Sequence, residues 1–244
     1  MEYKVRNIKI SSNQREEFWR DVEQNKWESF SFDLLDKYIK KDKLFIDIGA
    51  WNGVLSLYSA KLGARVISFE PDIVAYNELK DNILLNKDIA ENIKYSMKAI
   101  SNKNGFAYIS NITEGFGNSM SSLINRENSK KGNKVECITL PKFITDNNIN
   151  PSDICLIKID TEGGEALIIP QCREFLKKYK PVIYLSLHSF WFPDRENDIK
   201  ITEEVIYETY DVSDIRNGGI VLQANFEQRM KQYTCDEFIL TPKI

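Results

Sequence analysis

The chain has 244 residues, 42% of them hydrophobic, and a net charge of −3. This length fits one α/β domain with a modest extension, and the acidic balance excludes a global basic field that would attract nucleic acid phosphates. No apolar run approaches the ~20 residues that a membrane span needs, and no N-terminal segment resembles a signal peptide. The four cysteines lie apart without a Cys-x-x-Cys pair, so we expect free thiols, a cytoplasmic location and no structural zinc site.

Apolar residues recur at three- and four-residue spacing between residues 13 and 40, which predicts amphipathic helices. We expect residues 1–42 to form an N-terminal helical extension that caps a cofactor mouth, and residues 43–244 to form the main domain. From Leu44 onward, apolar strands alternate with helices. The strands are expected at 44–48, 65–69, 93–100, 154–159 and 182–187, and the helices at 54–62, 72–86 and 164–178, the last interrupted at Pro170.

Residues 101–134 are rich in Gly, Asn, Ser and Lys. They predict a strand at 106–109 and then a mobile loop from Asn111 to Asn133 that becomes ordered over an acceptor. Near the C-terminus we expect strands over 218–224 and 238–241. Strand–helix alternation followed by a terminal strand pair predicts an α/β fold with a mostly parallel sheet and an antiparallel edge.

The most informative pattern lies between the first two strands of this domain. The first strand runs into the turn Asp47-x-Gly49-x-x-x-Gly53, and the second ends at Glu70. Glycines allow the backbone to approach a ligand, and an acid after the second strand accepts hydrogen bonds from ribose hydroxyls. The spacing differs from the Gly-x-Gly-x-x-Gly of dinucleotide sites, and Asp47 would repel phosphates. The pattern therefore favours a cationic, adenosine-containing ligand with an amino-acid moiety, namely S-adenosylmethionine.

Four segments resemble the FkbM family of methyltransferases, and the resemblance covers roughly residues 27–192. They are Phe-Ile-Asp-Ile-Gly-Ala-Trp-Asn-Gly (45–53), Phe-Glu-Pro-Asp (69–72), Ala-Ile-Ser-Asn-Lys-Asn-Gly (99–105) and Ile-Lys-Ile-Asp-Thr-Glu-Gly-Gly-Glu (157–165). The resemblance implies a seven-stranded Rossmann-like class I methyltransferase fold. It also implies O-methylation of sugars and other natural-product hydroxyls. The chain departs from the family at Leu140-Pro141-Lys142, where relatives often have Leu-Asp-Asp.

The residues expected to bind the cofactor come from the turn, the strand ends and the stretch that contacts adenine in related enzymes. They are Asp47, Gly49, Ala50, Trp51, Asn52, Gly53, Glu70, Pro71, Ala99, Ile100, Ser101, Asp160 and Glu162. Serines at 119, 121 and 122 fall where relatives often have serines near the cofactor, although a plain loop explains them equally well.

Two residues are candidates for the chemistry. Asp160 emerges directly from an apolar strand, and His188, the only histidine, ends the neighbouring strand. Removal of a hydroxyl proton during methyl transfer suits histidine, which titrates near neutral pH. We expect His188 or Asp160 to be the base and no metal cofactor, with a cation held by Asp160, Glu162 and His188 as the alternative. Glu165 fits the role of a helix cap.

The resemblance implies O-methylation of a small molecule, a sugar of a surface glycan or its nucleotide-linked precursor. Three rivals remain. The glycine spacing disfavours a nicotinamide dehydrogenase, and the intact acids disfavour a non-catalytic S-adenosylmethionine-binding protein. RNA methylation is opposed by the acidic balance and by the absence of an Asn/Asp-Pro-Pro-Tyr motif. The oligomeric state stays open.

Overall fold

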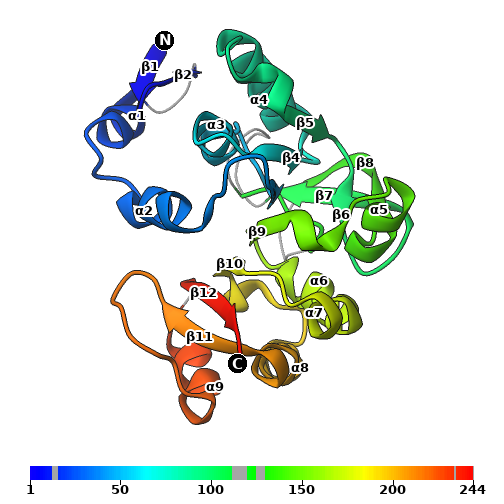
Figure 1. Cartoon of the computed structure of the whole chain (residues 1–244). Helices are drawn as coiled ribbons and strands as arrows, with labels where there is room; N and C mark the ends of the chain where they lie inside the picture. The colour runs from blue at the N-terminus through cyan, green and yellow to red at the C-terminus, as the bar shows by residue number, and fades with distance from the viewer. Residues whose placement is uncertain (13–15, 112–119, 125–129, 234, 244) are drawn as a thin grey trace.

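A computed structural model describes residues 1–12, 16–111, 120–124, 130–233 and 235–243 (Figure 1). The strands are β1 (Glu2–Val5), β2 (Ile8–Ser11), β3 (Leu44–Ile48), β4 (Arg65–Phe69), β5 (Ile93–Ser96), β6 (Ala99–Ile100), β7 (Gly105–Asn111), β8 (Lys130–Ile138), β9 (Ile154–Ile159), β10 (Ile183–Leu187), β11 (Tyr210–Asp214) and β12 (Asp236–Pro242). The α-helices are α1 (Glu16–Glu23), α2 (Ser29–Tyr38), α3 (Val54–Lys61), α4 (Ile73–Leu85), α5 (Leu140–Asp146), α6 (Glu165–Gln171), α7 (Arg173–Tyr179), α8 (Arg195–Thr209) and α9 (Gln223–Gln232). Short 3₁₀ turns are η1 (Ala90–Asn92), η2 (Pro151–Asp153) and η3 (Ser189–Trp191).

A seven-stranded sheet with the order β11-β12-β10-β9-β3-β4-β5 forms the centre of the molecule. Its strands from β10 to β5 pair in parallel, whereas β12 pairs antiparallel with both β10 and β11. This confirms the expected α/β fold with a mostly parallel sheet and an antiparallel C-terminal edge. The carboxyl ends of β3, β4, β9 and β10 lie at one edge of the sheet, which positions the residues that follow them.

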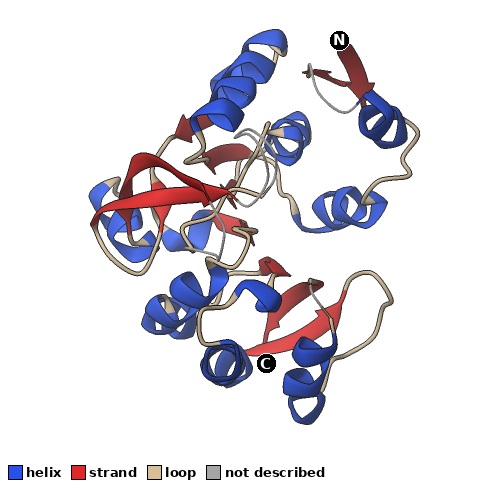
Figure 2. Ribbon diagram, turned by 180° about the vertical axis from the view of Figure 1, so that it is seen from behind, coloured by secondary structure: helices blue, strands red, loops and turns tan. Residues whose placement is uncertain are grey.

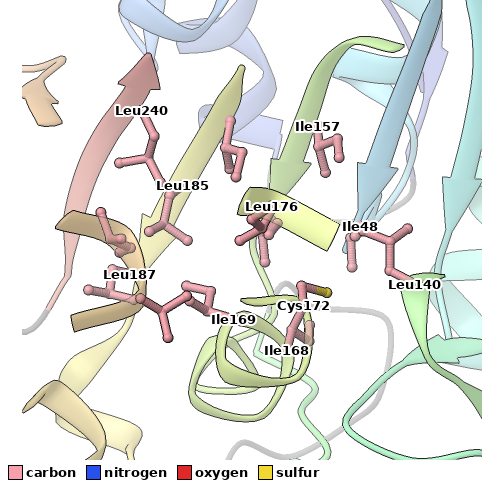
Figure 3. Packing of buried hydrophobic residues seen from close by; sticks show 14 of the residues in the cluster. Ile48, Leu140, Ile157, Ile168, Ile169, Cys172, Leu176, Leu185, Leu187 and Leu240 are labelled. Carbon is pink, nitrogen blue, oxygen red and sulfur yellow. The ribbon is translucent and has the colours of Figure 1, made fainter. Parts of the chain in front are cut away.

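Helices cover both faces of this sheet and enclose two hydrophobic cores (Figure 2). Because successive side chains of a strand point to opposite faces, Phe45 and Ile46 of β3 enter different cores. Helices α1 to α4 contribute to the core around Phe45, and α5 to α9 contribute to the core around Ile46. Figure 3 shows part of the second core, where Leu185 of β10 lies near Ile169 of α6 and Leu176 of α7. Burial on both faces explains why these strands read as continuous apolar runs.

A second, three-stranded sheet with the order β6-β8-β7 lies beside the main one. The sequence predicts one strand over residues 93–100, but β5 belongs to the main sheet whereas β6 pairs in parallel with β8. The predicted strand at 106–109 is confirmed as part of β7. The predicted mobile loop, residues 111–133, falls largely outside the described residues, which within it comprise Asn111, residues 120–124 and the beginning of β8.

The predicted N-terminal helices are present as α1 and α2, but β1 and β2 precede them as an antiparallel hairpin that the sequence analysis missed. The predicted helix over 164–178 is divided into α6 and α7 at Cys172, and Pro170 lies inside α6.

The strand predicted over residues 218–224 is wrong, because residues 218–222 form a loop with only an isolated β-bridge from Ile220 to Ser213, and α9 begins at Gln223. Phe226 and Met230 lie four residues apart on this helix, so both face the core and are buried. The partner of the final strand is instead β11, which directly follows α8.

Candidate active site

A cavity of about 280 Å³ lies at the carboxyl ends of β3, β4, β9 and β10. Ligands of open parallel sheets bind at this edge. Eleven of the residues selected from the sequence line the cavity. They are Asp47, Gly49, Ala50, Trp51, Glu70, Pro71, Ala99, Ile100, Asp160, Glu162 and His188.

Asn52, Gly53 and Ser101 do not line this cavity. The Asn52 carbonyl accepts a hydrogen bond from Asn82 Nδ2 (3.0 Å), which ties the turn after β3 to α4. Gly53 has φ +85°, and a Cβ there would lie 2.3 Å from Cδ1 of Leu79. The Ser101 amide donates to the Ile138 carbonyl (3.1 Å). In the structure these three residues therefore shape the backbone around the cavity.

The glycine at position 49 is required by a close backbone approach. Gly49 has φ +83°, and a Cβ there would lie 1.7 Å from the Asp160 carbonyl oxygen. A side chain at 49 would thus push apart the turns that follow β3 and β9. The glycine turn after β3 and the acidic segment after β9, which are separate in the sequence, are therefore in direct backbone contact.

Lys158, in the middle of apolar β9, connects the carboxylates beneath the cavity. Its Nζ donates to Asp160 Oδ2 (3.0 Å) and to the Gly49 carbonyl (3.2 Å), and lies 3.7 Å from Asp47 Oδ1. Asp47 is fully buried, and its Oδ2 accepts from Ser56 Oγ (2.6 Å). Lys158 was not selected from the sequence. A lysine inside an apolar strand, two residues before an acid, is the signal that could have identified it.

The charges of Lys158 and of the two carboxylates near it shift one another's pKa values. Burial alone would lower the pKa of Lys158, but the carboxylates of Asp160 and Asp47 raise it above its ordinary value. Burial alone would raise the pKa of Asp160, but Lys158 and His188 bring it below its ordinary value. For Asp47, burial dominates and raises the pKa. Asp160 is therefore an ionised carboxylate, with 33% of its side chain exposed.

Glu70 holds the turn from the other side. Its Oε2 accepts from the Trp51 amide (2.7 Å) and its Oε1 from the Asp72 amide (2.9 Å). Burial raises the pKa of Glu70 to about 8, although both amides oppose this. Asp72 in turn caps α4 by accepting from the Val74 amide (2.9 Å).

The segment after β9 is organised by Glu165, which is fully buried. Its Oε1 accepts from the amide (2.7 Å) and hydroxyl (2.8 Å) of Thr161. Its Oε2 accepts from the amides of Gly163 (3.0 Å) and His188 (3.2 Å). Glu165 therefore joins the ends of β9 and β10 and does not line the cavity. The expected role as a helix cap is wrong, because the N-cap of α6 is Gly164 and the Glu165 carboxylate binds groups outside the helix.

His188 lies among three carboxylates. Its Nδ1 is 3.9 Å from Asp160 Oδ1 and 3.7 Å from Glu165 Oε1, and its Nε2 is 3.5 Å from Glu162 Oε1. Burial alone would lower the pKa of His188, but Cys235, Glu165 and Glu162 raise it well above its ordinary value. The structure thus favours a positive charge at this point of the cavity.

Residues 121–123 also line the cavity. Ser121 Oγ donates to the Asp72 carboxylate, and Ser122 Oγ donates to the Thr161 carbonyl (3.3 Å). Ser119 lies outside the described residues.

Several lining residues were not among the site residues selected from the sequence, namely Phe18, Trp27, Glu28, Ser186, Arg216, Cys235 and Glu237. Glu237 Oε1 accepts from Ser186 Oγ (2.9 Å) and lies 3.2 Å from an Arg216 guanidinium nitrogen. Burial, followed by the charges of Glu237 and Asp160, raises the pKa of Glu28 to about 7.

An aromatic cluster joins the N-terminal extension to the glycine turn. Trp51 stacks on Trp19, with ring centroids 5.6 Å apart, and meets Phe18 edge-to-face at 5.7 Å. Phe18 also meets Trp27 edge-to-face at 5.1 Å. These contacts place Phe18 and Trp27 against the cavity, beside the turn.

The fold, with a glycine turn and acids at the strand ends, is that of a class I methyltransferase. The sequence model of the Methyltransferase FkbM domain matches residues 47–218, most of the chain. The chain therefore belongs to the FkbM methyltransferase family. This confirms the class expected from the sequence, an S-adenosylmethionine-dependent methyltransferase.

Other similarities are narrower. Ribosomal protein L11 methyltransferase of Ruminiclostridium cellulolyticum is 44% identical over 59 residues, 24% of this chain and 19% of that protein. The same enzyme of Aquifex aeolicus is 43% identical over 54 residues, 22% of each chain. The matches thus span about a fifth of these curated relatives.

Among solved structures, the SAM-dependent methyltransferase from Agrobacterium tumefaciens has a TM-score of 0.51 at 14% identity and covers 100% of this chain and 70% of that one. This likeness shows the fold. Methyltransferase FkbM from Methylobacillus flagellatus has a TM-score of 0.49 at 13% identity, covering 90% and 60%. Within the described residues, every helix is too short or too polar to cross a bilayer.

Proposed function

We propose that this protein transfers the methyl group of S-adenosylmethionine to a hydroxyl oxygen of a small molecule, a sugar of a surface glycan or its nucleotide-linked precursor. The observation that carries the proposal is the carboxylate-lined cavity at the strand ends, in which the turn after β3 and the acids after β4 and β9 meet. Such a cavity favours a cofactor with a positive sulfonium. The free cysteines of the described residues fit a cytoplasmic site of action.

In this proposal the cofactor lies against the turn. Gly49, Ala50 and Trp51 offer backbone close to the ligand, and Glu70 accepts hydrogen bonds from the ribose hydroxyls. Ala99 and Ile100 line the same cavity and provide an apolar contact for the adenine ring. Asp47 and Asp160, joined by Lys158, lie under the methionine end. This assignment accounts for the acids that the fold alone does not require.

The acceptor would occupy the part of the cavity lined by the N-terminal and C-terminal segments. Phe18 and Trp27 offer aromatic surface, and Glu28, Arg216 and Glu237 offer hydrogen-bonding groups. A few polar groups among aromatic side chains suit a small hydroxylated molecule.

The sulfonium already activates the methyl group, so the protein mainly aligns acceptor oxygen, methyl carbon and sulfur. The hydroxyl proton must leave as the oxygen–carbon bond forms. Asp160 and His188 lie together at the ends of β9 and β10, where they can meet this hydroxyl. They are therefore the residues to which we assign the chemistry.

The test combines binding and turnover with the full chain. Calorimetry should show saturable binding of S-adenosylhomocysteine and none of NAD. Labelled S-adenosylmethionine should then methylate at least one member of a panel of nucleotide-linked and free sugars. Binding of NAD instead would overturn the cofactor assignment. Cofactor binding with methyl transfer only to RNA or protein substrates would overturn the proposed acceptor. Cofactor binding with no transfer to any acceptor would favour a non-catalytic binding protein.

A further inference from the structure

Three cavity-lining side chains have the composition and spacing of a metal site. Asp160, Glu162 and His188 each offer one ligand atom, and these atoms lie within 4.8 Å of one another. Donors bound to one divalent ion at about 2.1 Å lie roughly 3–4.2 Å apart, so a separation of 4.8 Å would have to shorten by about 0.6–1.8 Å for one ion to bind all three. The cluster joins the ends of two adjacent parallel strands, because Asp160 and Glu162 follow β9 and His188 follows β10.

The hydrogen bonds around Asp160 leave one of its oxygens directed at His188. Lys158 Nζ binds Asp160 Oδ2, so the other oxygen, Oδ1, faces His188. Glu165 already accepts four hydrogen bonds and lies outside the cavity lining, so it positions the segment without competing as a ligand.

A second observation points to a ligand at the same place. Nδ1 of His188 is sealed from solvent and lacks a partner at hydrogen-bonding distance among the described residues; the nearby carboxylate oxygens of Glu165 and Asp160 lie 3.7 and 3.9 Å away. A buried polar atom without such a bond is costly unless something binds it. The side chain as a whole is 11% exposed, and it contributes to the cavity lining.

We propose that Asp160, Glu162 and His188 bind one divalent cation that holds the acceptor hydroxyl in the cavity. Carboxylates suit Mg²⁺ and Mn²⁺, and an imidazole ligand shifts the preference towards Mn²⁺ or other transition metals. Lys158 and Glu165 are positioning residues that orient the ligands, as the neighbours of metal ligands commonly do. This inference rests on the proposed function and specifies how its hydroxyl would be activated.

The cation would act as a Lewis acid. A bound divalent ion lowers the pKa of a coordinated oxygen, as zinc does for water, so the hydroxyl loses its proton to solvent water. The acceptor oxygen then forms a bond to the methyl carbon. The carbon–sulfur bond breaks, its electron pair goes to sulfur, and S-adenosylhomocysteine leaves. The products are the methyl ether, S-adenosylhomocysteine and one proton.

The experiment titrates the full chain with Mn²⁺ alone and measures binding as the loss of the free-ion signal in electron paramagnetic resonance. We expect one ion per chain. The variants Glu162→Gln and His188→Gln should each weaken binding at least about tenfold. Glu78→Gln, a half-buried carboxylate on α4 that does not line the cavity, is the matched control and should leave the affinity unchanged. Thermal unfolding of each variant reports whether it folds, and Asp160→Asn serves as a replacement for either variant.

Two results would overturn the metal site. One is no binding of Mn²⁺, Mg²⁺ or Zn²⁺ by the wild-type chain, with or without S-adenosylhomocysteine. The other is binding that the cluster variants leave intact, or that the control weakens equally. Binding of S-adenosylhomocysteine is measured separately, so failure of the cofactor site and failure of the metal site give different results.

Discussion

Replacing Glu70 by alanine should weaken cofactor binding while the chain stays folded. Glu70 lies at the end of β4, and its two oxygens accept hydrogen bonds from the amides of Trp51 and Asp72. Each carboxylate oxygen has a second lone pair that can accept from a ribose hydroxyl. A hydrogen bond to a charged group contributes about 1.5–3 kcal/mol. The dissociation constant of S-adenosylhomocysteine should therefore rise roughly 10- to 150-fold.

The same side chain should couple cofactor binding to pH. Because burial raises the pKa of Glu70 to about 8, most of this carboxyl group carries a proton at pH 7 before ligand binds. Ribose hydroxyls that donate to it, and a sulfonium nearby, favour the ionised form. Binding at pH 7 should therefore release protons. Calorimetry in two buffers with different ionisation enthalpies measures this, and Glu70→Ala should reduce the difference.

Glu78→Gln is the matched control, because Glu78 lies on the following helix, α4, and does not line the cavity. It should bind the cofactor like the wild type. A folded Glu70→Ala variant that also binds S-adenosylhomocysteine as tightly as the wild type would refute the reasoning.

Three further predictions concern stability, measured by urea unfolding. Gly49→Ala should lower the free energy of unfolding by more than about 3 kcal/mol, because its Cβ would overlap the Asp160 carbonyl. The control Gly218→Ala, at φ +73° in open space, should lower it by only about 1–2 kcal/mol, and equal losses would contradict the close approach. Lys158→Met should lower the free energy of unfolding by about 3–5 kcal/mol, because it leaves buried carboxylates uncompensated, and adding Asp160→Asn should recover part of this loss. Wild-type stability of the single variant would contradict the role of the ion pair. Burial raises the pKa of Glu28 from 4.5 to about 7, so the unfolded chain loses this proton first and the free energy of unfolding falls as pH rises between those values. Glu28→Gln should make that fall less steep, and an unchanged pH profile would contradict the raised pKa of Glu28.

The strand, turn and strand from Leu44 to Glu70 could be predicted because every part carries a local signal. Apolar runs mark the strands, Gly49 marks a turn with positive φ, and Glu70 stands where an apolar run ends. The position of Asp160 followed from the same logic, since the carboxyl ends of parallel strands share one edge.

The rest of the cavity depends on contacts between distant segments. Lys158 looks like an ordinary polar interruption of a strand until Asp47 and Asp160 are seen around it. Glu28 lies between two helices with no motif, and Glu237 belongs to the final strand. The misplaced strand at 218–224 has a similar cause, because its apolar residues gave no period by which to separate a loop from the beginning of α9.

The division of the cavity between segments has an evolutionary consequence. The match to the family spans residues 47–218, and it contains the turn, the strand-end acids and His188. Phe18, Trp27, Glu28 and Glu237 line the same cavity from outside that span. Replacement of the first 42 residues by a different segment would therefore remodel one side of the cavity while leaving in place the side that we propose for the cofactor. Relatives that share one cofactor chemistry can in this way diverge in the molecules they modify, by exchanging a terminal segment instead of altering the sheet.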